Sequence, residues 1–83
     1  MQTVYVLQSS RDHNLYIGCT SDLSRRLDQH LKGKVRATKG RLPLTLIYKE
    51  EYSDVYEAFR RERFYKTAKG KRELRTKIDC GIV

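Results

Sequence analysis

The sequence predicts an α+β domain in the element order β-β-α-β-α-α. Two short segments rich in β-branched and aromatic residues, 3–9 and 15–19, flank a polar turn. Two later segments carry apolar residues at helical spacing, and a third strand-like run, 44–48, lies between them. A hairpin followed by helices is typical of an α+β fold with an antiparallel component. At 83 residues the chain is expected to form a single domain, residues 1–83.

The first two segments are expected to pair as a hairpin across the turn 10–14. Both parities of 3–9 are apolar, which predicts a strand that is covered on both faces. An even-length loop places Tyr5 and Tyr16 on the same face of the sheet, because side chains alternate with a period of two. Gly18 follows closely and allows backbone or substrate to approach.

A first helix is expected to begin at the N-cap signal Ser21–Asp22 and to close at Gly33. Its apolar stripe consists of Leu23, Leu27 and Leu31. Residues 32–41 are basic and contain two glycines, which predicts a loop before the strand 44–48.

A second helix is expected to start after Ser53–Asp54, where Asp54 and Glu57 have the spacing of a capping box. Its apolar positions are Val55, Ala58, Phe59 and Ala68. Gly70 is expected to end or kink this helix, and residues 71–78 to form a short basic helix.

The composition excludes several classes of protein. Hydrophobic residues make up 39% of the chain, too many for a disordered tail, and no run approaches the roughly 18 apolar residues of a membrane span. Residues 1–7 resemble a strand and not a signal peptide. We therefore expect Cys19 and Cys80 to be reduced thiols in the cytoplasm, and with two histidines at these spacings they make no zinc signature.

The positive charge is large and clustered. Eighteen Lys and Arg face ten Asp and Glu, for a formal net charge of +8. Residues 32–41 are basic without an acid, and residues 60–77 hold nine basic and two acidic side chains. Two such blocks predict a polyanionic partner, although a solvated surface that keeps the protein in solution is the alternative. The expected phosphate contacts are Lys34, Arg36, Lys39, Arg41, Lys69, Lys71 and Arg72.

Glu62 interrupts the apolar stripe of the second helix. It lies between Ala58, Phe59 and Tyr65 on the helical wheel. A carboxylate there loses hydration and needs a partner. One interpretation is a salt bridge to Lys66, four residues on. The other is a metal ion, and a single carboxylate suits Mg²⁺ that keeps waters and takes further ligands from a substrate phosphate.

The first helix carries Arg26 and His30 on one face, four residues apart. An arginine can hold a phosphate with its planar fork, and a histidine can exchange a proton near neutral pH. The alternative is an exposed Arg and a half-buried His. Tyr5 and Tyr16 are equally compatible with core aromatics, and we expect them to transfer protons only if positive charge lowers their pKa.

Taken in order, these residues resemble the GIY-YIG nuclease superfamily. The resemblance rests on Val4-Tyr5, on Tyr16-Ile17-Gly18, on the segment 22–30 and on the segment 57–62, and it covers roughly residues 3–77. The most similar members are small stand-alone bacterial proteins related to the N-terminal nuclease domain of the excinuclease C subunit. The resemblance implies a three-stranded antiparallel sheet flanked by helices and metal-dependent cleavage of phosphodiester bonds.

The resemblance also implies roles for individual residues. It assigns catalytic positions to Tyr5, Tyr16, Arg26 and His30, and metal binding to Glu62, with Mg²⁺ or Mn²⁺ as the cofactor. Three departures stand out. The glycine of the first motif is Thr3 here, and the Asn that many members carry after the glutamate helix is absent, since the only asparagine is Asn14. The third is that no attached recognition domain is expected, which is why little sequence specificity is predicted.

These inferences predict a cytoplasmic endonuclease with little sequence specificity that acts on nucleic acid, on DNA in preference to RNA. No membrane association is expected. One alternative is a nucleic-acid-binding module that keeps the fold and has lost useful turnover. A third possibility is a basic adaptor that binds proteins.

Overall fold

The computed structural model describes residues 1–81, with side chains as far as residue 79, so the side chain of Cys80 lies outside the described part. The elements are β1 (Gln2–Ser9), β2 (Leu15–Thr20), α1 (Leu23–Leu31), the 3₁₀ helix η1 (Lys39–Arg41), β3 (Leu44–Tyr52), α2 (Val55–Tyr65) and α3 (Ala68–Gly81). This order confirms the α+β class and the sequence β-β-α-β-α-α.

The three strands form one antiparallel sheet in the order β2-β1-β3. β1 is the central strand, and five consecutive residues from Thr3 to Leu7 are buried, as its two-sided apolar pattern predicts. The hairpin register pairs Tyr5 with Gly18 and Leu7 with Tyr16. Both tyrosines therefore face the same side, which confirms the expectation from alternation.

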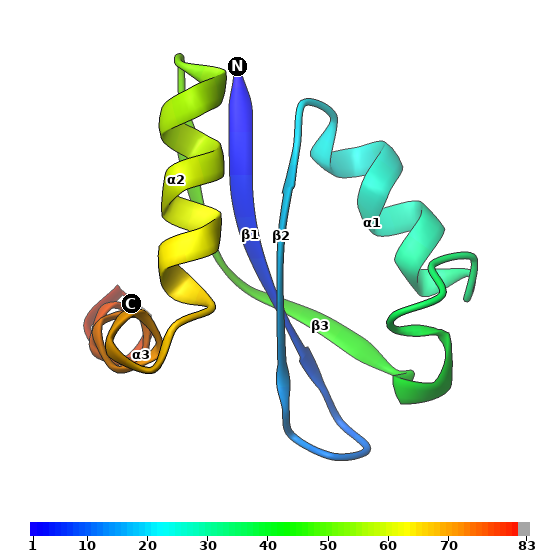
Figure 1. The fold of residues 1–83 in the computed structure, drawn as a ribbon. Helices are drawn as coiled ribbons and strands as arrows, with labels where there is room; N and C mark the ends of the chain where they lie inside the picture. The colour runs from blue at the N-terminus through cyan, green and yellow to red at the C-terminus, as the bar shows by residue number, and fades with distance from the viewer. Residues whose placement is uncertain (82–83) are drawn as a thin grey trace.

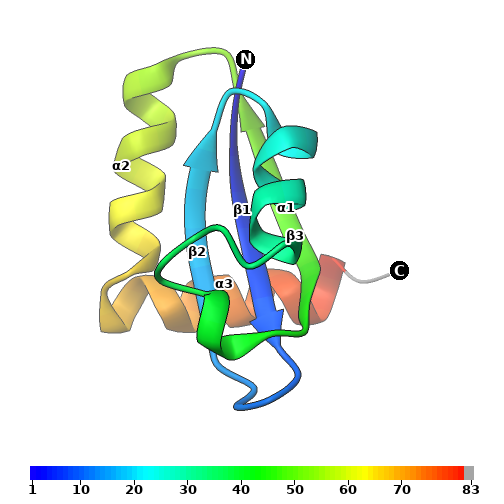
Figure 2. The same ribbon diagram turned by 90° about the vertical axis from the view of Figure 1, so that its right-hand side faces the viewer.

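Helices cover both faces of the sheet. Seen along the sheet, α1 and the loop that follows it lie on one side, and α2 and α3 lie on the other (Figure 1). The view turned by 90° shows α3 crossing behind the strands at the hairpin end (Figure 2). The larger core, on the α2–α3 side, contains Val4, Val6, Ile17, Ala58, Tyr65, Leu74 and Ile78. The smaller core contains Tyr5, Leu7 and Leu44, with Leu23 and Leu27 of α1 packed on it.

The signals at the ends of α1 act as predicted, but its stripe is shorter. Asp22 caps the helix by accepting a hydrogen bond from the backbone N–H of Arg25. Gly33 follows the helix with a φ of 72°, a left-handed conformation that favours glycine. Leu31 is 58% exposed, so the apolar contact of α1 is made by its first two turns.

Two expectations about the second half of the chain were wrong. Ala68 belongs to α3 and not to α2, and Gly70 lies inside the first turn of α3. A Cβ on Gly70 would come within 1.8 Å of the carbonyl oxygen of Phe64, so this glycine permits close packing of α3 against the end of α2. Thr67 takes over the boundary, because its hydroxyl accepts from the N–H of Gly70 and donates to the carbonyl of Phe64.

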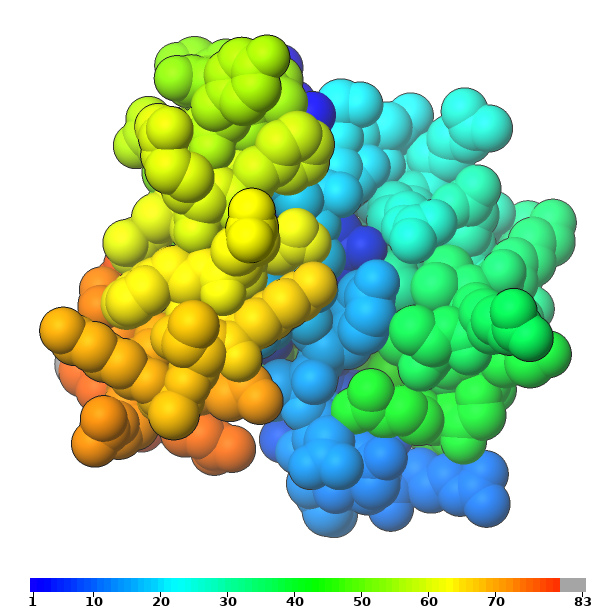
Figure 3. All heavy atoms as spheres, viewed as in Figure 1, coloured from blue at the N-terminus to red at the C-terminus, as the bar shows by residue number. Residues whose placement is uncertain are grey.

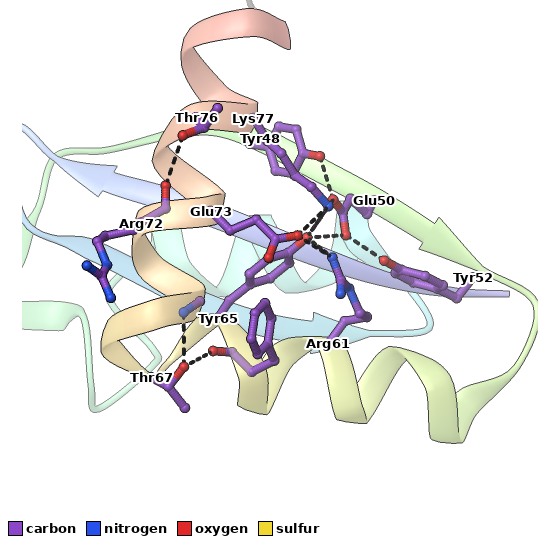
Figure 4. Close-up of polar contacts among 12 residues, drawn as sticks. Tyr48, Glu50, Tyr52, Arg61, Tyr65, Thr67, Arg72, Glu73, Thr76 and Lys77 are labelled. Atoms are coloured by element: carbon purple, nitrogen blue, oxygen red, sulfur yellow. Dashed lines mark hydrogen bonds and ion pairs between the residues drawn. The ribbon is translucent and has the colours of Figure 1, made fainter.

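The third strand is longer than the apolar run 44–48 indicates, and a largely buried carboxylate is stabilised in its second half. Glu50 of β3 accepts hydrogen bonds from the hydroxyls of Tyr48, Tyr52 and Tyr65, at 2.5, 2.5 and 2.7 Å. Lys77 of α3 adds an ion pair at 3.1 Å. These contacts fasten both α2 and α3 to β3 (Figure 4). Within residues 1–81, no helix is both long and apolar enough to span a bilayer.

Candidate active site

A chain of buried hydrogen bonds links β1, α1 and the basic loop. The phenol oxygen of Tyr5 lies 3.0 Å from Nε2 of His30, and Nδ1 of His30 lies 2.8 Å from Oγ1 of Thr38. All three side chains are at most 1% exposed. His30 is thus more buried than the half-buried histidine that its position on the helix indicates.

Arg26 joins this chain from the more exposed side. Its Nε donates to the phenol oxygen of Tyr5 at 3.4 Å, and Nη1 donates to Oε1 of Gln29 at 3.1 Å. With Arg26 donating to it, Tyr5 can direct its own proton to His30, which then donates from Nδ1 to Thr38. The hydrogen bond to Tyr5 and, less strongly, the interaction with Tyr16 raise the pKa of Arg26 above its ordinary value.

Tyr16 completes an aromatic cluster at the edge strand. Its ring centroid lies 6.3 Å from that of Tyr5 and 5.0 Å from that of His30, edge to face. Tyr16 and Arg26 are both partly exposed, so they present this cluster to the surface. The structure therefore brings together all four residues to which the resemblance assigns catalytic positions: Tyr5, Tyr16, Arg26 and His30.

The glycine of the second motif makes room for the phenol of Tyr5. A Cβ built on Gly18 would lie 2.4 Å from the hydroxyl oxygen of Tyr5 and 2.5 Å from Cζ. The ring of Tyr5 consequently crosses the backbone of β2 at the only position where that strand has no side chain. The Tyr-Ile-Gly sequence is thus a packing requirement of this cluster as well as a motif.

Burial dominates the proton affinities of the cluster. It raises the pKa of Tyr5 above its ordinary value, although the hydrogen bond from Arg26 opposes the shift. It lowers the pKa of His30, and the positive charge of Arg26 acts in the same direction. Contrary to the sequence-based expectation, positive charge does not lower the pKa of Tyr5 overall. Near neutral pH the cluster consists of a protonated phenol, a neutral imidazole and a charged guanidinium.

Glu62 lies on the opposite face of the sheet from this cluster. It belongs to α2, and its carboxylate pairs with Lys66 at 3.4 Å, the salt bridge that the spacing predicts. The side chain is 20% exposed, and its charge raises the pKa of Cys19 in β2, after the larger effect of burial. Among residues 1–79 no hydrogen bond or ion pair joins Glu62 to the tyrosines. The two features flank the same edge strand from opposite faces.

Glu62 is a single carboxylate, so it offers a divalent cation one protein side chain as a ligand. Within the described residues, no three His, Cys, Asp or Glu side chains come together to hold a metal ion. A cation on Glu62 would therefore complete its shell with water and substrate phosphate, which suits Mg²⁺ or Mn²⁺. Lys66 is 55% exposed and its pairing with Glu62 is weak, so it offers little competition.

The two basic blocks meet beside β2. Arg41 of η1 and Lys71 of α3 line one pocket together with Arg75, which the sequence analysis did not select. The other predicted phosphate contacts are exposed, three in the loop and two on α3: Lys34, Arg36, Lys39, Lys69 and Arg72. Asn14 lies in the turn between β1 and β2 and lines the same pocket. Figure 3 shows a hollow along β2, between the helices α2 and α3 and the loop.

The main residue that sequence reasoning missed is Thr38. It lies in the segment predicted to be an exposed basic loop, yet it is completely buried. A short run of buried positions, Val35 and Thr38, anchors this loop under α1. The i, i+3 spacing of two β-branched residues between lysines and arginines is the one sequence signal for this anchor.

Comparison with known families matches residues 1–76 to the GIY-YIG catalytic domain. The chain belongs to the GIY-YIG family. The resemblance in the sequence is thereby confirmed, and the family suggests a nuclease-like protein that binds nucleic acid.

Among GIY-YIG relatives, similar proteins carry only a family number as a name. The UPF0213 protein SAG0778 of Streptococcus agalactiae is 44% identical over 64 residues, which is 76% of this chain and 72% of the relative. The UPF0213 protein SH2523 of Staphylococcus haemolyticus is 37% identical over 73 residues, 87% and 88% of the two chains. The solution structure of the UPF0213 protein BH0048 from Bacillus halodurans has a TM-score of 0.58 and 32% identity, over 92% of this chain and 84% of that one.

Proposed function

We propose that this chain is a metal-dependent endonuclease that hydrolyses phosphodiester bonds of DNA or RNA with little intrinsic sequence specificity. The observation that carries the proposal is the hydrogen-bonded cluster of Tyr5, His30 and Arg26 against the edge strand, with Tyr16 beside it. A purely structural core has no need for a guanidinium, an imidazole and two phenols at one place. The membership of the GIY-YIG family supports the same conclusion.

Each side chain has a role that follows from its contacts. Tyr5 first hands its proton to Nε2 of His30, and the resulting phenoxide then takes the proton of the attacking water. Arg26 stabilises the negative charge that forms on the phenol oxygen, and its guanidinium, which is partly exposed, also binds a non-bridging oxygen of the phosphate. Tyr16, at the partly exposed end of the cluster, positions the water or the phosphate.

Glu62 would hold Mg²⁺ or Mn²⁺ from the far side of β2. When bound, the ion supplies charge stabilisation at the leaving oxygen. In the absence of an ion, the same carboxylate pairs with Lys66. The cytoplasmic location and the preference for DNA over RNA belong to the same proposal.

A nuclease assay on linear, branched and single-stranded DNA and RNA, with Mg²⁺, Mn²⁺ or chelator, tests the function. We expect cleavage that needs the cation and is abolished in Glu62→Gln, while the free energy of unfolding changes by less than about 0.5 kcal/mol because the lost ion pair is weak. Tyr5→Phe is expected to lose cleavage as well. Equal cleavage by wild type and Glu62→Gln would overturn the metal role.

A second candidate function is a nucleic-acid-binding module without useful turnover. The raised pKa of Tyr5, which comes from its burial, favours this alternative because a tightly held proton makes a poor base. The assay separates the two functions. Nucleic-acid binding without cation-dependent cleavage on any substrate, and unchanged by Arg26→Ala and Glu62→Ala, identifies the module.

A further inference from the structure

A pocket of about 400 Å³ opens at the hairpin end of β2. One wall is cationic and polar, and the other wall is apolar. The lining residues are Arg41 of η1, Lys71 and Arg75 of α3, Asn14 of the turn, and Leu15 and Ile17 of β2. The pocket thus gathers side chains from four separate parts of the chain, and a set of three cations at one opening favours an anionic ligand.

The positive charge of this pocket is only partly compensated. Arg41 pairs with Asp12 through Nε at 3.2 Å, which leaves its terminal nitrogens available. Lys71 and Arg75 form no ion pair with any carboxylate among residues 1–79, and both are exposed. Each hydrogen bond that they make to a bound phosphate therefore replaces a contact with water and not an internal ion pair.

The pocket adjoins the proposed cleavage site through β2. Leu15 and Ile17 are the neighbours of Tyr16 in this strand, and alternation turns their side chains to the α2–α3 face while Tyr16 faces α1. β2 is the edge strand of the sheet, so no other strand separates the two faces there.

A second pocket close by is a poorer candidate. It has about 300 Å³ and shares Leu15 and Arg75 with the first. Its remaining wall includes the carboxylate of Asp79 and the apolar side chains of Ile47 and Ile78. A carboxylate at the opening repels an anion, which leaves the first pocket as the place where phosphate is favoured.

We infer that the first pocket holds one nucleotide unit of the same nucleic-acid strand that passes Tyr16. Its phosphate lies on Lys71, Arg75 and Arg41, and its sugar lies against Leu15 and Ile17. This inference rests on the proposed function and adds to it a second point of attachment, which fixes the strand in register along β2. Contacts of this kind position the backbone and read no bases.

Fluorescence anisotropy with a labelled single-stranded DNA oligonucleotide, in chelator so that no cleavage occurs, tests the pocket. Lys71→Ala and Arg75→Ala are each expected to weaken binding roughly tenfold at low salt, because each removes a hydrogen bond to a charged phosphate. Each is also expected to reduce the salt slope of the binding constant by about one. The matched control is Lys49→Ala, which removes the same charge from β3, at the other edge of the sheet.

The outcomes separate the inference from the function on which it rests. If both pocket variants bind as tightly as Lys49→Ala while wild type binds and cleaves, the pocket inference is wrong and the nuclease proposal stands. If wild type binds neither DNA nor RNA at low salt, the proposed function is overturned first. Inorganic phosphate is titrated in parallel by amide NMR. If phosphate shifts the amide signals of Asn14 and Arg75 and DNA does not compete with the bound phosphate, the inference is also overturned.

Discussion

Oγ1 of Thr38 lies 2.8 Å from Nδ1 of His30, and both side chains are completely buried. This contact ties the basic loop to the imidazole, and the imidazole in turn contacts the phenol of Tyr5. A hydrogen bond to one ring nitrogen sets which of the two carries the proton. The loop that is expected to meet the phosphate backbone thus also contacts the imidazole that we propose as the proton acceptor.

Replacing Thr38 with valine is expected to leave Nδ1 of His30 without a partner. An unsatisfied buried donor costs about 1–3 kcal/mol, so the free energy of unfolding should fall by that amount in urea titrations. The matched control is Thr38→Ser, which keeps the hydroxyl and is expected to retain most of the stability. Nitrogen NMR of the imidazole gives an independent measurement, and an unchanged tautomer in Thr38→Val would contradict the assigned role.

Replacing Gly18 with alanine is expected to displace the ring of Tyr5. The added Cβ would lie 2.4 Å from the phenol oxygen, and overpacking of this kind costs roughly 1–3 kcal/mol. Cleavage is expected to fall with the geometry of the cluster. Gly40→Ala is the control, because a Cβ at Gly40 meets nothing within 4 Å, and its stability is expected to stay within about 0.5 kcal/mol of wild type. Equal unfolding temperatures of Gly18→Ala and Gly40→Ala would contradict this prediction, because the ring of Tyr5 would then move away from the added Cβ without cost.

The carboxylate of Glu50 is expected to make folding sensitive to acid. Burial opposes its charge, but hydrogen bonds from Tyr48, Tyr52, Tyr65 and Lys77 lower its pKa from an ordinary value of 4.5 to about 2. As the pH falls, Glu50 therefore binds a proton at a higher pH in the unfolded chain than in the folded protein. The stabilisation is complete above about pH 4.5, and its loss, about 3 kcal/mol, extends down to about pH 2.

Urea unfolding of Glu50→Gln between pH 2 and pH 7 measures this contribution. The variant is expected to be less stable than wild type at pH 7 and to lack most of the change in stability over the acid range. Glu51→Gln is the control, since Glu51 is the next residue and its pair with Lys49 lies at the surface. A similar acid dependence in wild type and Glu50→Gln would refute the assignment.

The pH dependence of cleavage is expected to follow His30. Burial and the charge of Arg26 lower its pKa below the ordinary value of 6.5, so the neutral imidazole persists at pH 6.5 and the acid limb lies lower. The unfolded imidazole takes its proton first, and folding stability therefore also declines as the pH falls below 6.5. Single-turnover rates across the pH range check the expectation. If the cleavage rate already falls at a pH above 6.5, and falls in the same way in His30→Gln, the pH dependence comes from another group and the expectation is wrong.

Alternation, capping and helical spacing sufficed to predict most of the fold. Tyr5 and Tyr16 share a face because the side chains of a strand have a period of two, and Asp22 and Gly33 bound α1 through local backbone chemistry. These features depend on residues within a few positions of one another. The exposed Leu31 shows the limit of the approach, because periodicity identifies a stripe and does not say where the sheet beneath it ends.

The features that local reasoning did not predict depend on contacts between distant parts of the chain. Glycine disfavours helices, so the sequence predicts that Gly70 ends one. Its position inside α3 is explained only by its closeness to the carbonyl of Phe64, which leaves no room for a Cβ. A charged residue such as Glu50 suggests the end of a strand. It lies within β3 because tyrosines from both β3 and α2 donate hydrogen bonds to its carboxylate. Thr38 directly precedes the short 3₁₀ helix η1, which the sequence did not predict, so no predicted element indicated the direction of its side chain. The roles assigned to the site residues remain predictions.

The place of β2 at the margin of the sheet has one last consequence. Within residues 1–81 it pairs with a strand on one side only, so its outer peptide groups are available to any extended chain that lies alongside. A peptide that added itself to this edge would lie in the plane of the sheet, directly beside the strand that carries Tyr16 on one face and Leu15 and Ile17 on the other. Such an added strand would extend the sheet through backbone hydrogen bonds alone, without contact with the buried phenol of Tyr5 or the imidazole of His30.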